Sequence, residues 1–315
     1  MTSANSCPSS RTAPGGRPLA PRAGADDREG HGRSATRRAL GAAATLAASV
    51  GIIPAAVGDV PEVPAARSNA FRVEVEGSYS PGDYGTGVET DFFGITPEFE
   101  WLRPRSAYGI AIPFVHLRAS ADVVLIGGRP VPTPLALRLG PLVPSSAVDA
   151  ERSFTGIGDT LLWGDATFLT GTATRPWVTG RLEVKVPTAD EEKHLGTGEA
   201  DLDAGVDVAQ PVGRHYLLGS GGFTKVGDPP DFDLDDIVRI GVGFSWSLSE
   251  RASILAFIEN SSNPVPGLEE RRVAQVGGEI AFGREQRGWL SGSLSFGLTD
   301  TSEEVSLALS LGGEF

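Results

Sequence analysis

Cysteine is almost absent from this chain, since its 315 residues include a single one, Cys7. We expect Cys7 to be lost with an export signal, which excludes a disulfide framework, a redox couple and a Cys-based zinc site in the mature chain. Uninterrupted apolar runs of about 18 residues are missing after Val57, so no transmembrane helix is expected there. Basic residues are outnumbered: the net charge is −13 and the pI about 4.8, which excludes nucleic acid, because its phosphates would repel the chain.

Glycine and proline, which are typical of the turns between β-strands, are abundant. The chain has 41 glycines and 23 prolines, as a turn-rich all-β protein requires. The segment Glu303 to Phe315 shows the pattern most clearly, because apolar residues from Val305 to Leu311 alternate with small or polar ones. Side chains alternate across a strand, so this segment is predicted to be a strand with one continuous apolar face. It ends on Phe315, which is similar to the closing-strand signal that the assembly machinery of outer-membrane barrels reads.

The same alternation recurs along the chain with turn residues between the repeats. Twelve strands are predicted: 71–79, 88–103, 108–117, 156–169, 177–187, 199–210, 216–225, 238–248, 252–259, 273–282, 289–299 and 303–315. A shift of parity at Phe92-Phe93-Gly94 predicts a bulge in the second strand. Each strand has roughly the ten residues that a tilted strand needs to cross a bilayer, and an even strand number is typical of single-chain bacterial barrels.

The connections fall into two classes. One set is short and basic, such as Pro104-Arg105 and Gly213-Arg214, and the other is longer and acidic, such as 228–236 and 260–270. Short periplasmic turns and long external loops are typical of outer-membrane barrels. Four tryptophans lie beside the short turns, as in an interfacial girdle, although Trp177 has the parity of the lumen: Trp101, Trp177, Trp246 and Trp289. We therefore predict an all-β fold, a closed antiparallel up-and-down transmembrane β-barrel of about 12 strands, spanning residues 67–315.

Residues 1–66 are predicted to be a disordered segment with an export signal peptide. The apolar run Leu40 to Val57 follows Arg33, Arg37 and Arg38 and precedes an Ala/Pro-rich stretch, which favours the general secretory route. The alternative is that these residues form a flexible tail. The predicted location of the mature protein is the bacterial outer membrane.

The polar face of the strands carries charged residues, which would line the lumen. The predicted pore-lining residues are Asp159, Asp165, Arg181, Glu183, Lys185, Asp201, Asp203, Asp207, Arg239 and Glu279. Counting back from the hairpins places Asp165 opposite Arg181 and Lys185 opposite Asp201. These charges either set the selectivity of a pore or form salt bridges that fill the interior. The connection Ala119 to Phe154 is long enough to act as a gate or constriction, and the alternative is a poorly ordered surface loop.

Three motifs carry a resemblance to a known family. They are Gly156-Ile157-Gly158-Asp159, the segment Lys185-Val186-Pro187-Thr188-Ala189-Asp190, and Leu195-Gly196-Thr197-Gly198. They resemble the G-x-G-D, K-x-P-T-G-D and L-G-T-G motifs of the outer-membrane transporters named for the meta pathway of phenol degradation, with Ala189 in place of a glycine. The resemblance covers roughly residues 71–315. It implies a lipid-embedded barrel that passes small, often aromatic or hydrophobic compounds.

Catalytic and metal-binding patterns are weak. The mature chain has three histidines, His116, His194 and His215, and the residue two positions after His116 is Arg118, which offers no hydroxyl for a same-face Ser–His pair. The acidic run from Asp228 to Asp236 lacks the Gly and closing Glu of an EF-hand loop, which favours a solvated loop over a Ca²⁺ site. We expect no enzyme activity and no cofactor.

The main hypothesis is a passive channel for small solutes, aromatic or hydrophobic ones included. Its expected partners are the outer-membrane bilayer, the barrel-assembly machinery through Phe315, and a small-molecule solute, but no nucleic acid. The alternatives are a structural or adhesive barrel with a plugged lumen and functional external loops, and a secreted soluble β-protein.

Overall fold

The computed structural model describes residues 69–84, 89–119, 123–126, 129–132, 152–230, 233–283 and 286–315. Strands dominate these residues, and the helical element among them is the single 3₁₀ turn η1 (Glu191–Lys193). No helix in this part of the chain is long and apolar enough to cross a membrane. The predicted export signal at Leu40 to Val57 lies outside the described residues.

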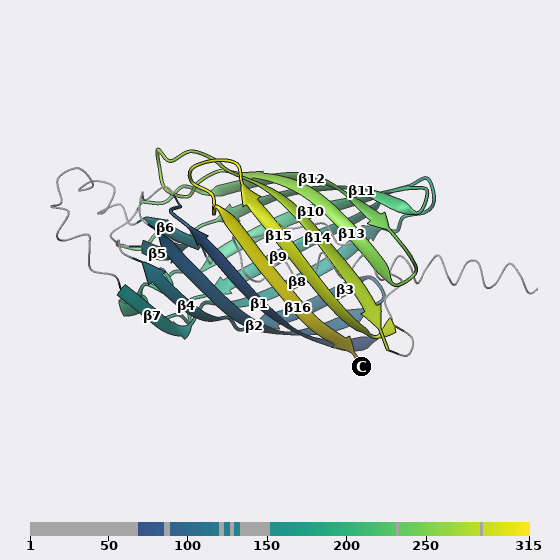
Figure 1. Cartoon of the computed structure of the whole chain (residues 1–315), viewed down its shortest axis with the longest axis horizontal. Helices are drawn as coiled ribbons and strands as arrows, with labels where there is room; N and C mark the ends of the chain where they lie inside the picture. Colours follow the sequence, from purple (N-terminus) through teal and green to yellow (C-terminus); the bar gives the residue numbers. More distant parts are fainter. Residues whose placement is uncertain are drawn as a thin grey trace, which may run out of the picture.

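Figure 1 shows the strands as a tilted, closed barrel, coloured from dark blue at β1 to yellow at β16. The wall strands are β1 (Ala70–Gly82), β2 (Thr90–Arg103), β3 (Ser106–Ala111), β4 (Phe114–Ala119), β7 (Arg152–Ile157), β8 (Thr160–Leu169), β9 (Trp177–Val186), β10 (Asp201–Val212), β11 (His215–Lys225), β12 (Ile237–Ser247), β13 (Ala252–Ser261), β14 (Arg271–Phe282), β15 (Gly288–Gly297) and β16 (Val305–Glu314). Every pairing is antiparallel between neighbours, and β1 pairs with both β16 and β2, which closes the sheet. The strands β5 (Val123–Ile126) and β6 (Arg129–Pro132) form a separate hairpin that pairs with no described wall strand.

Two positions in the wall are occupied by strands in two parts. The C-terminal half of β2, from Glu98, pairs with β3, and its N-terminal half, up to Ile95, pairs with β4. On their other edges β3 pairs with β8 and β4 pairs with β7. The first break contains Pro113, which has no amide proton for the ladder. The Gly158 N–H at the second break donates to the Pro113 carbonyl oxygen at 2.8 Å, which links the two breaks. Counting each pair as one strand, the described wall has the twelve strands predicted from the sequence.

The apolar face of the wall points outward. Val184, Leu202, Val242 and Leu309 are 38–56% exposed, and they belong to a belt of exposed large apolar side chains to which every described wall strand contributes at least one. On the other face, Lys185 is only 4% exposed. Lipid is the solvent that such a belt matches, because every backbone polar group of a closed ladder is already paired. The outward apolar face that the sequence predicts is therefore confirmed.

The tryptophan girdle is only half confirmed. Trp101 and Trp246 are 47% and 40% exposed, and each packs against an outward phenylalanine, Phe71 and Phe244 respectively. Trp177 and Trp289 are buried on the inner face. The prediction for Trp289 is wrong because the level of a residue in the membrane does not determine its face: only the parity along the strand does.

The predicted bulge at residues 92–94 is also wrong. β2 pairs with β1 without interruption from Thr90 to Leu102, with Phe92 turned inward and Phe93 outward. The mouth of the barrel contains an apolar cluster that accommodates Phe92, so the apolar pair needs no change of register. The register shift in the described wall lies instead between Thr167 and Leu169 of β8.

Candidate functional site: the barrel interior and its outer mouth

The β5–β6 hairpin lies across the outer mouth of the barrel. Val123 and Leu125 pack with residues of the wall strands β2, β4 and β16, including Phe92 and Leu117. The opposite side of the hairpin, with Val124, Ile126 and Val131, packs against apolar residues of the external loops and of the first position of β12: Val226, Leu234, Ile237, Val265 and Leu268. The described part of the predicted gate segment is thus buried on both sides. The rest of this segment, residues 120–122, 127–128 and 133–151, lies outside the described residues.

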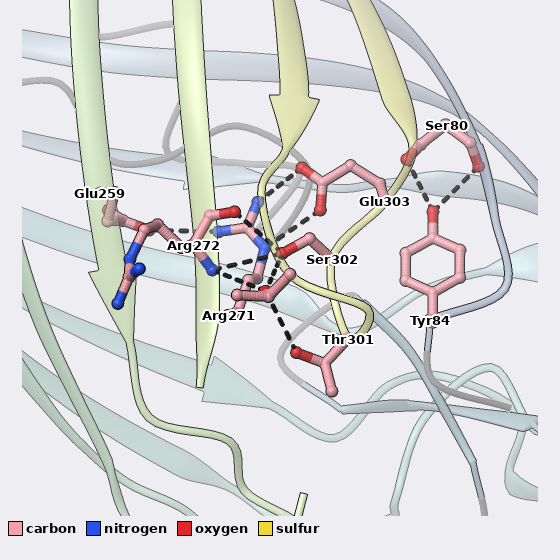
Figure 2. Close-up of polar contacts among 9 residues, drawn as sticks. Ser80, Tyr84, Glu259, Arg271, Arg272, Thr301, Ser302 and Glu303 are labelled. Atoms are coloured by element: carbon pink, nitrogen blue, oxygen red, sulfur yellow. Dashed lines mark hydrogen bonds and ion pairs between the residues drawn. The ribbon is translucent and has the colours of Figure 1, made fainter. Parts of the chain in front are cut away.

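Figure 2 shows a cluster of buried charges, the mouth cluster, where β13, β14 and the β15–β16 loop meet. The Arg271 guanidinium donates to both oxygens of the Glu303 carboxylate at 2.6 and 3.1 Å and to Glu259 at 3.3 Å. All three side chains are at most 3% exposed. Tyr84 lies beside them and hydrogen-bonds to Ser80, and its burial raises the pKa of its hydroxyl. A two-pronged guanidinium–carboxylate contact of this kind fixes the loop against the wall.

The three motifs that carry the family resemblance converge in space. The Asp159 carboxylate accepts hydrogen bonds from the backbone N–H groups of Thr188 and Ala189, at 3.1 and 3.0 Å. The Lys185 ammonium lies 3.4 Å from Asp159 and 2.9 Å from Asp201. We call Asp159, Lys185, Thr188, Thr197 and Asp201 the motif cluster, in which Thr197 accepts a further hydrogen bond from Lys185.

The first glycine of the third motif, Gly196, lies too close to its neighbours to carry a side chain. A Cβ at Gly196 would lie 2.7 Å from the Ala189 Cβ and 2.9 Å from an Asp159 carboxylate oxygen. The next residue back, Leu195, is buried in the apolar cluster that holds the hairpin, and the Leu125 N–H donates to the His194 carbonyl. The motif cluster therefore connects the break between β7 and β8 to the loop that supports the mouth. At the far side of this loop the Lys193 ammonium hydrogen-bonds to Asp190 and lowers the pKa of its carboxyl.

The charge ladder predicted from the hairpins is present in the register. Asp165 pairs with Arg181 and Asp201 with Lys185. Nine of the ten predicted residues point inward from wall strands, and Asp159 lies at the break beside them: Asp165, Arg181, Glu183, Lys185, Asp201, Asp203, Asp207, Arg239 and Glu279.

Many of these inward charges are ion-paired with each other. Arg239 donates to Asp203 at 2.7 Å and to the Thr224 hydroxyl, which itself donates to Asp203. Arg181 lies 3.8 Å from Asp207. On this side of the barrel, positive and negative charges are interleaved.

The opposite side of the interior holds a set of acids that are not among the ten predicted pore-lining residues. Glu74 and Glu76 on β1 and Glu98 and Glu100 on β2 all point inward and are at most 5% exposed. We call these four residues the acidic wall. Its register places Glu74 directly opposite Glu98, a like-charge pair that destabilises a sheet. The signal was available, because Glu74 and Glu76 alternate with apolar residues, but the expected bulge hid the matching parity of Glu98 and Glu100.

Among the described residues, Arg72 is a cation that contacts the acidic wall. Arg72 lies 2.9 Å from Glu100 and stacks over the Trp289 ring at 5.0 Å. The Trp289 indole N–H donates to Glu74 at 3.0 Å, reaching across Gly312, where a Cβ would meet the indole. Next to this contact the inner face of β15 and β16 carries small hydroxyl side chains: Ser291, Ser293, Ser295, Ser306 and Ser310.

Histidine 116 is on the outer face of the wall. Its Nδ1 is 2.7 Å from the Thr155 hydroxyl and its Nε2 is 3.4 Å from the Ser153 hydroxyl, both on β7. The hydroxyl partners therefore come from the neighbouring strand β7 and not from the position two residues along β4, which is occupied by Arg118. In the described ranges, no group of three or more His, Cys, Asp or Glu residues is arranged to hold a metal ion. Asp231 of the acidic run lies outside those ranges.

Comparisons with known proteins extend these observations. No family profile matches the sequence, and no curated protein matches it. The structure is similar to the crystal structure of the COG4313 outer membrane channel from Pseudomonas putida F1, with a TM-score of 0.59, 16% identity, and 82% of this chain and 98% of that chain covered. It is also similar to the translocator domain of the autotransporter NalP from Neisseria meningitidis, with a TM-score of 0.50, 13% identity, and 94% and 100% covered. At these identities the likeness concerns the fold, and it agrees with the resemblance of the motifs: the chain has the fold of a bacterial outer-membrane β-barrel.

Proposed function

We propose that this protein is a passive outer-membrane channel for small solutes, including hydrophobic or aromatic ones. The observation that carries the proposal is the composition of the inner face, where charged, hydroxyl and glycine positions line a closed wall below an apolar mouth. A barrel that served only as an anchor would gain stability from an apolar interior, because buried charges cost more than packed hydrocarbon. The resemblance to the meta-pathway transporters and the similarity to an outer membrane channel point to the same function.

We include in this proposal the ten predicted pore-lining residues. The interleaved charges of β9, β10 and β12 would form one side of the solute path and the acidic wall the other. Residues 1–66 would be removed on export, and Phe315, whose backbone pairs with that of Phe71, would be read by the assembly machinery.

Single-channel recording in planar bilayers tests the function. The purified, folded protein is expected to give discrete conductance steps, and a variant that lacks the hairpin, with residues 121–150 replaced by a short Gly/Ser linker, is expected to conduct more. A correctly inserted protein that leaves the bilayer sealed in both forms would contradict the channel proposal and favour the adhesive alternative with a plugged lumen.

A further inference from the structure

The acidic wall contains more buried carboxyl groups than the described cations around it pair with. Glu76 and Glu98 are each 5% exposed. Arg72 lies 2.9 Å from Glu100 and also attracts the Glu98 carboxyl electrostatically, but among the described residues neither Glu76 nor Glu98 has a hydrogen bond or an ion pair. A carboxylate taken out of water without a partner is strongly unfavourable. Such an arrangement persists in a fold when something other than stability requires it.

Unpartnered hydroxyl groups face the same place. Thr96 is the direct cross-strand neighbour of Glu76, and Ser78 follows Glu76 on the same face of β1. Both side chains are at most 3% exposed, and neither hydroxyl has a hydrogen-bond partner. The carboxylates of Glu76 and Glu98 and these two hydroxyls thus present acceptors to one stretch of the interior, and Glu98 also faces the carboxylate of Glu74 across the two strands. The ligand that these groups fit is a cation that donates several hydrogen bonds.

We propose that the acidic wall binds the ammonium group of small amphiphilic amines and so makes them the preferred solutes of this channel. An ammonium group is a compact cation with three donors, which matches carboxylates and hydroxyls that converge from two adjacent strands. The apolar mouth formed by the β5–β6 hairpin accepts the hydrocarbon part of such a solute, and the acidic wall accepts its charge. This proposal rests on the proposed channel function, because the solute must enter the lumen to reach the wall.

Reversal potentials in planar bilayers test the selectivity. With KCl on one side and benzylammonium chloride on the other, we expect the wild-type channel to pass benzylammonium at least as well as K⁺, and to pass K⁺ better than benzoate when potassium benzoate is used. In the double variant Glu76→Gln/Glu98→Gln the permeability of benzylammonium relative to benzyl alcohol, followed by liposome efflux, should fall by about tenfold, which corresponds to roughly 1.4 kcal/mol. Glu304→Gln, an exposed acid in the β15–β16 loop, is the matched control and should change neither value.

The outcomes separate the two proposals. A conducting channel without cation preference, or one whose selectivity the double variant leaves unchanged, overturns the ammonium site while the channel function stands. A loss of K⁺ preference in the double variant with benzylammonium excluded from the wild type also overturns it, since the wall would then serve inorganic cations. A sealed bilayer overturns the channel function itself. The isosteric amides remove repulsion, so the double variant should resist heat and urea at least as well as the wild type, and retained heat-modifiable migration in gels shows that it folds.

Discussion

Replacement of Arg271 by methionine is expected to be among the most damaging single changes at the mouth of the barrel. The guanidinium holds two carboxylates, and all three side chains are at most 3% exposed. At an effective dielectric constant of about 20, unit charges 2.6 and 3.3 Å apart attract by about 6 and 5 kcal/mol before the cost of desolvation is subtracted. Removing the cation leaves Glu259 and Glu303 buried without it, and the expected net loss of stability is about 3–5 kcal/mol.

Urea unfolding in lipid vesicles, followed by tryptophan fluorescence and by heat-modifiable migration, measures this loss. Arg272→Met is the matched control: Arg272 is the next residue of β14, is exposed, and hydrogen-bonds to Asn260 on the outer face. It should cost about 1 kcal/mol or less. The triple variant Arg271→Met/Glu259→Gln/Glu303→Gln should recover part of the loss, because the uncompensated charges are gone. Equal losses in Arg271→Met and Arg272→Met would refute the view that burial of the charges, rather than their presence, decides the effect.

Three further changes follow from the contacts described. Gly312→Ala should cost about 1–3 kcal/mol and shift the fluorescence of Trp289, because its Cβ would meet the indole, while Gly313→Ala, with its nearest neighbour at 3.7 Å, should be close to neutral in the same urea titration. Lys185→Met should cost about 3–5 kcal/mol and raise the hydrogen exchange of Val123 to Ile126, since it leaves two buried carboxylates in the motif cluster, whereas the exposed Lys193→Met should do neither. The Asp190 carboxyl should titrate below the usual aspartate value of about 4 in ¹³C NMR spectra, and Lys193→Met should raise its midpoint. Because the folded protein favours the charged form of Asp190, its contact with Lys193 stabilises the fold above the usual aspartate pKa, and this stabilisation is lost as the pH falls through the lowered pKa. A titration midpoint of Asp190 that Lys193→Met leaves unchanged would contradict the role of this contact.

The sequence predicts the wall of this protein well, because alternation with a period of two is a local signal. The face of Val184, Leu202, Val242 and Leu309 and the pairing of Asp165 with Arg181 follow from parity and hairpin counting alone. Local patterns do not predict the orientation of a side chain where contacts between distant segments determine it. Phe92 points inward because β4, β5 and β16 form an apolar cluster around it, and no pattern within β2 reveals that cluster.

The interior was harder to predict than the wall. The pairing of Glu74 with Glu98 depends on a register that the false bulge had shifted, so the acidic wall was missed although each of its residues has the parity of the lumen. The motifs were recognised, but their convergence on Lys185 and Asp159 requires the loop after β9 to fold back on the break before β8. Partner strands also decided the surroundings of His116, whose hydroxyl neighbours belong to β7.

The hairpin at the outer mouth shares no ladder with the barrel around it. The pairing of β1 with β2 and β16 closes the cylinder without β5 and β6, which form a two-stranded sheet of their own held by side chains and by the bond from Leu125 to His194. Loss of the hairpin's contacts therefore breaks no pairing between wall strands. Release of the hairpin from the wall and unfolding of the cylinder are therefore two separate equilibria, and the hairpin can detach and return while every wall strand stays paired.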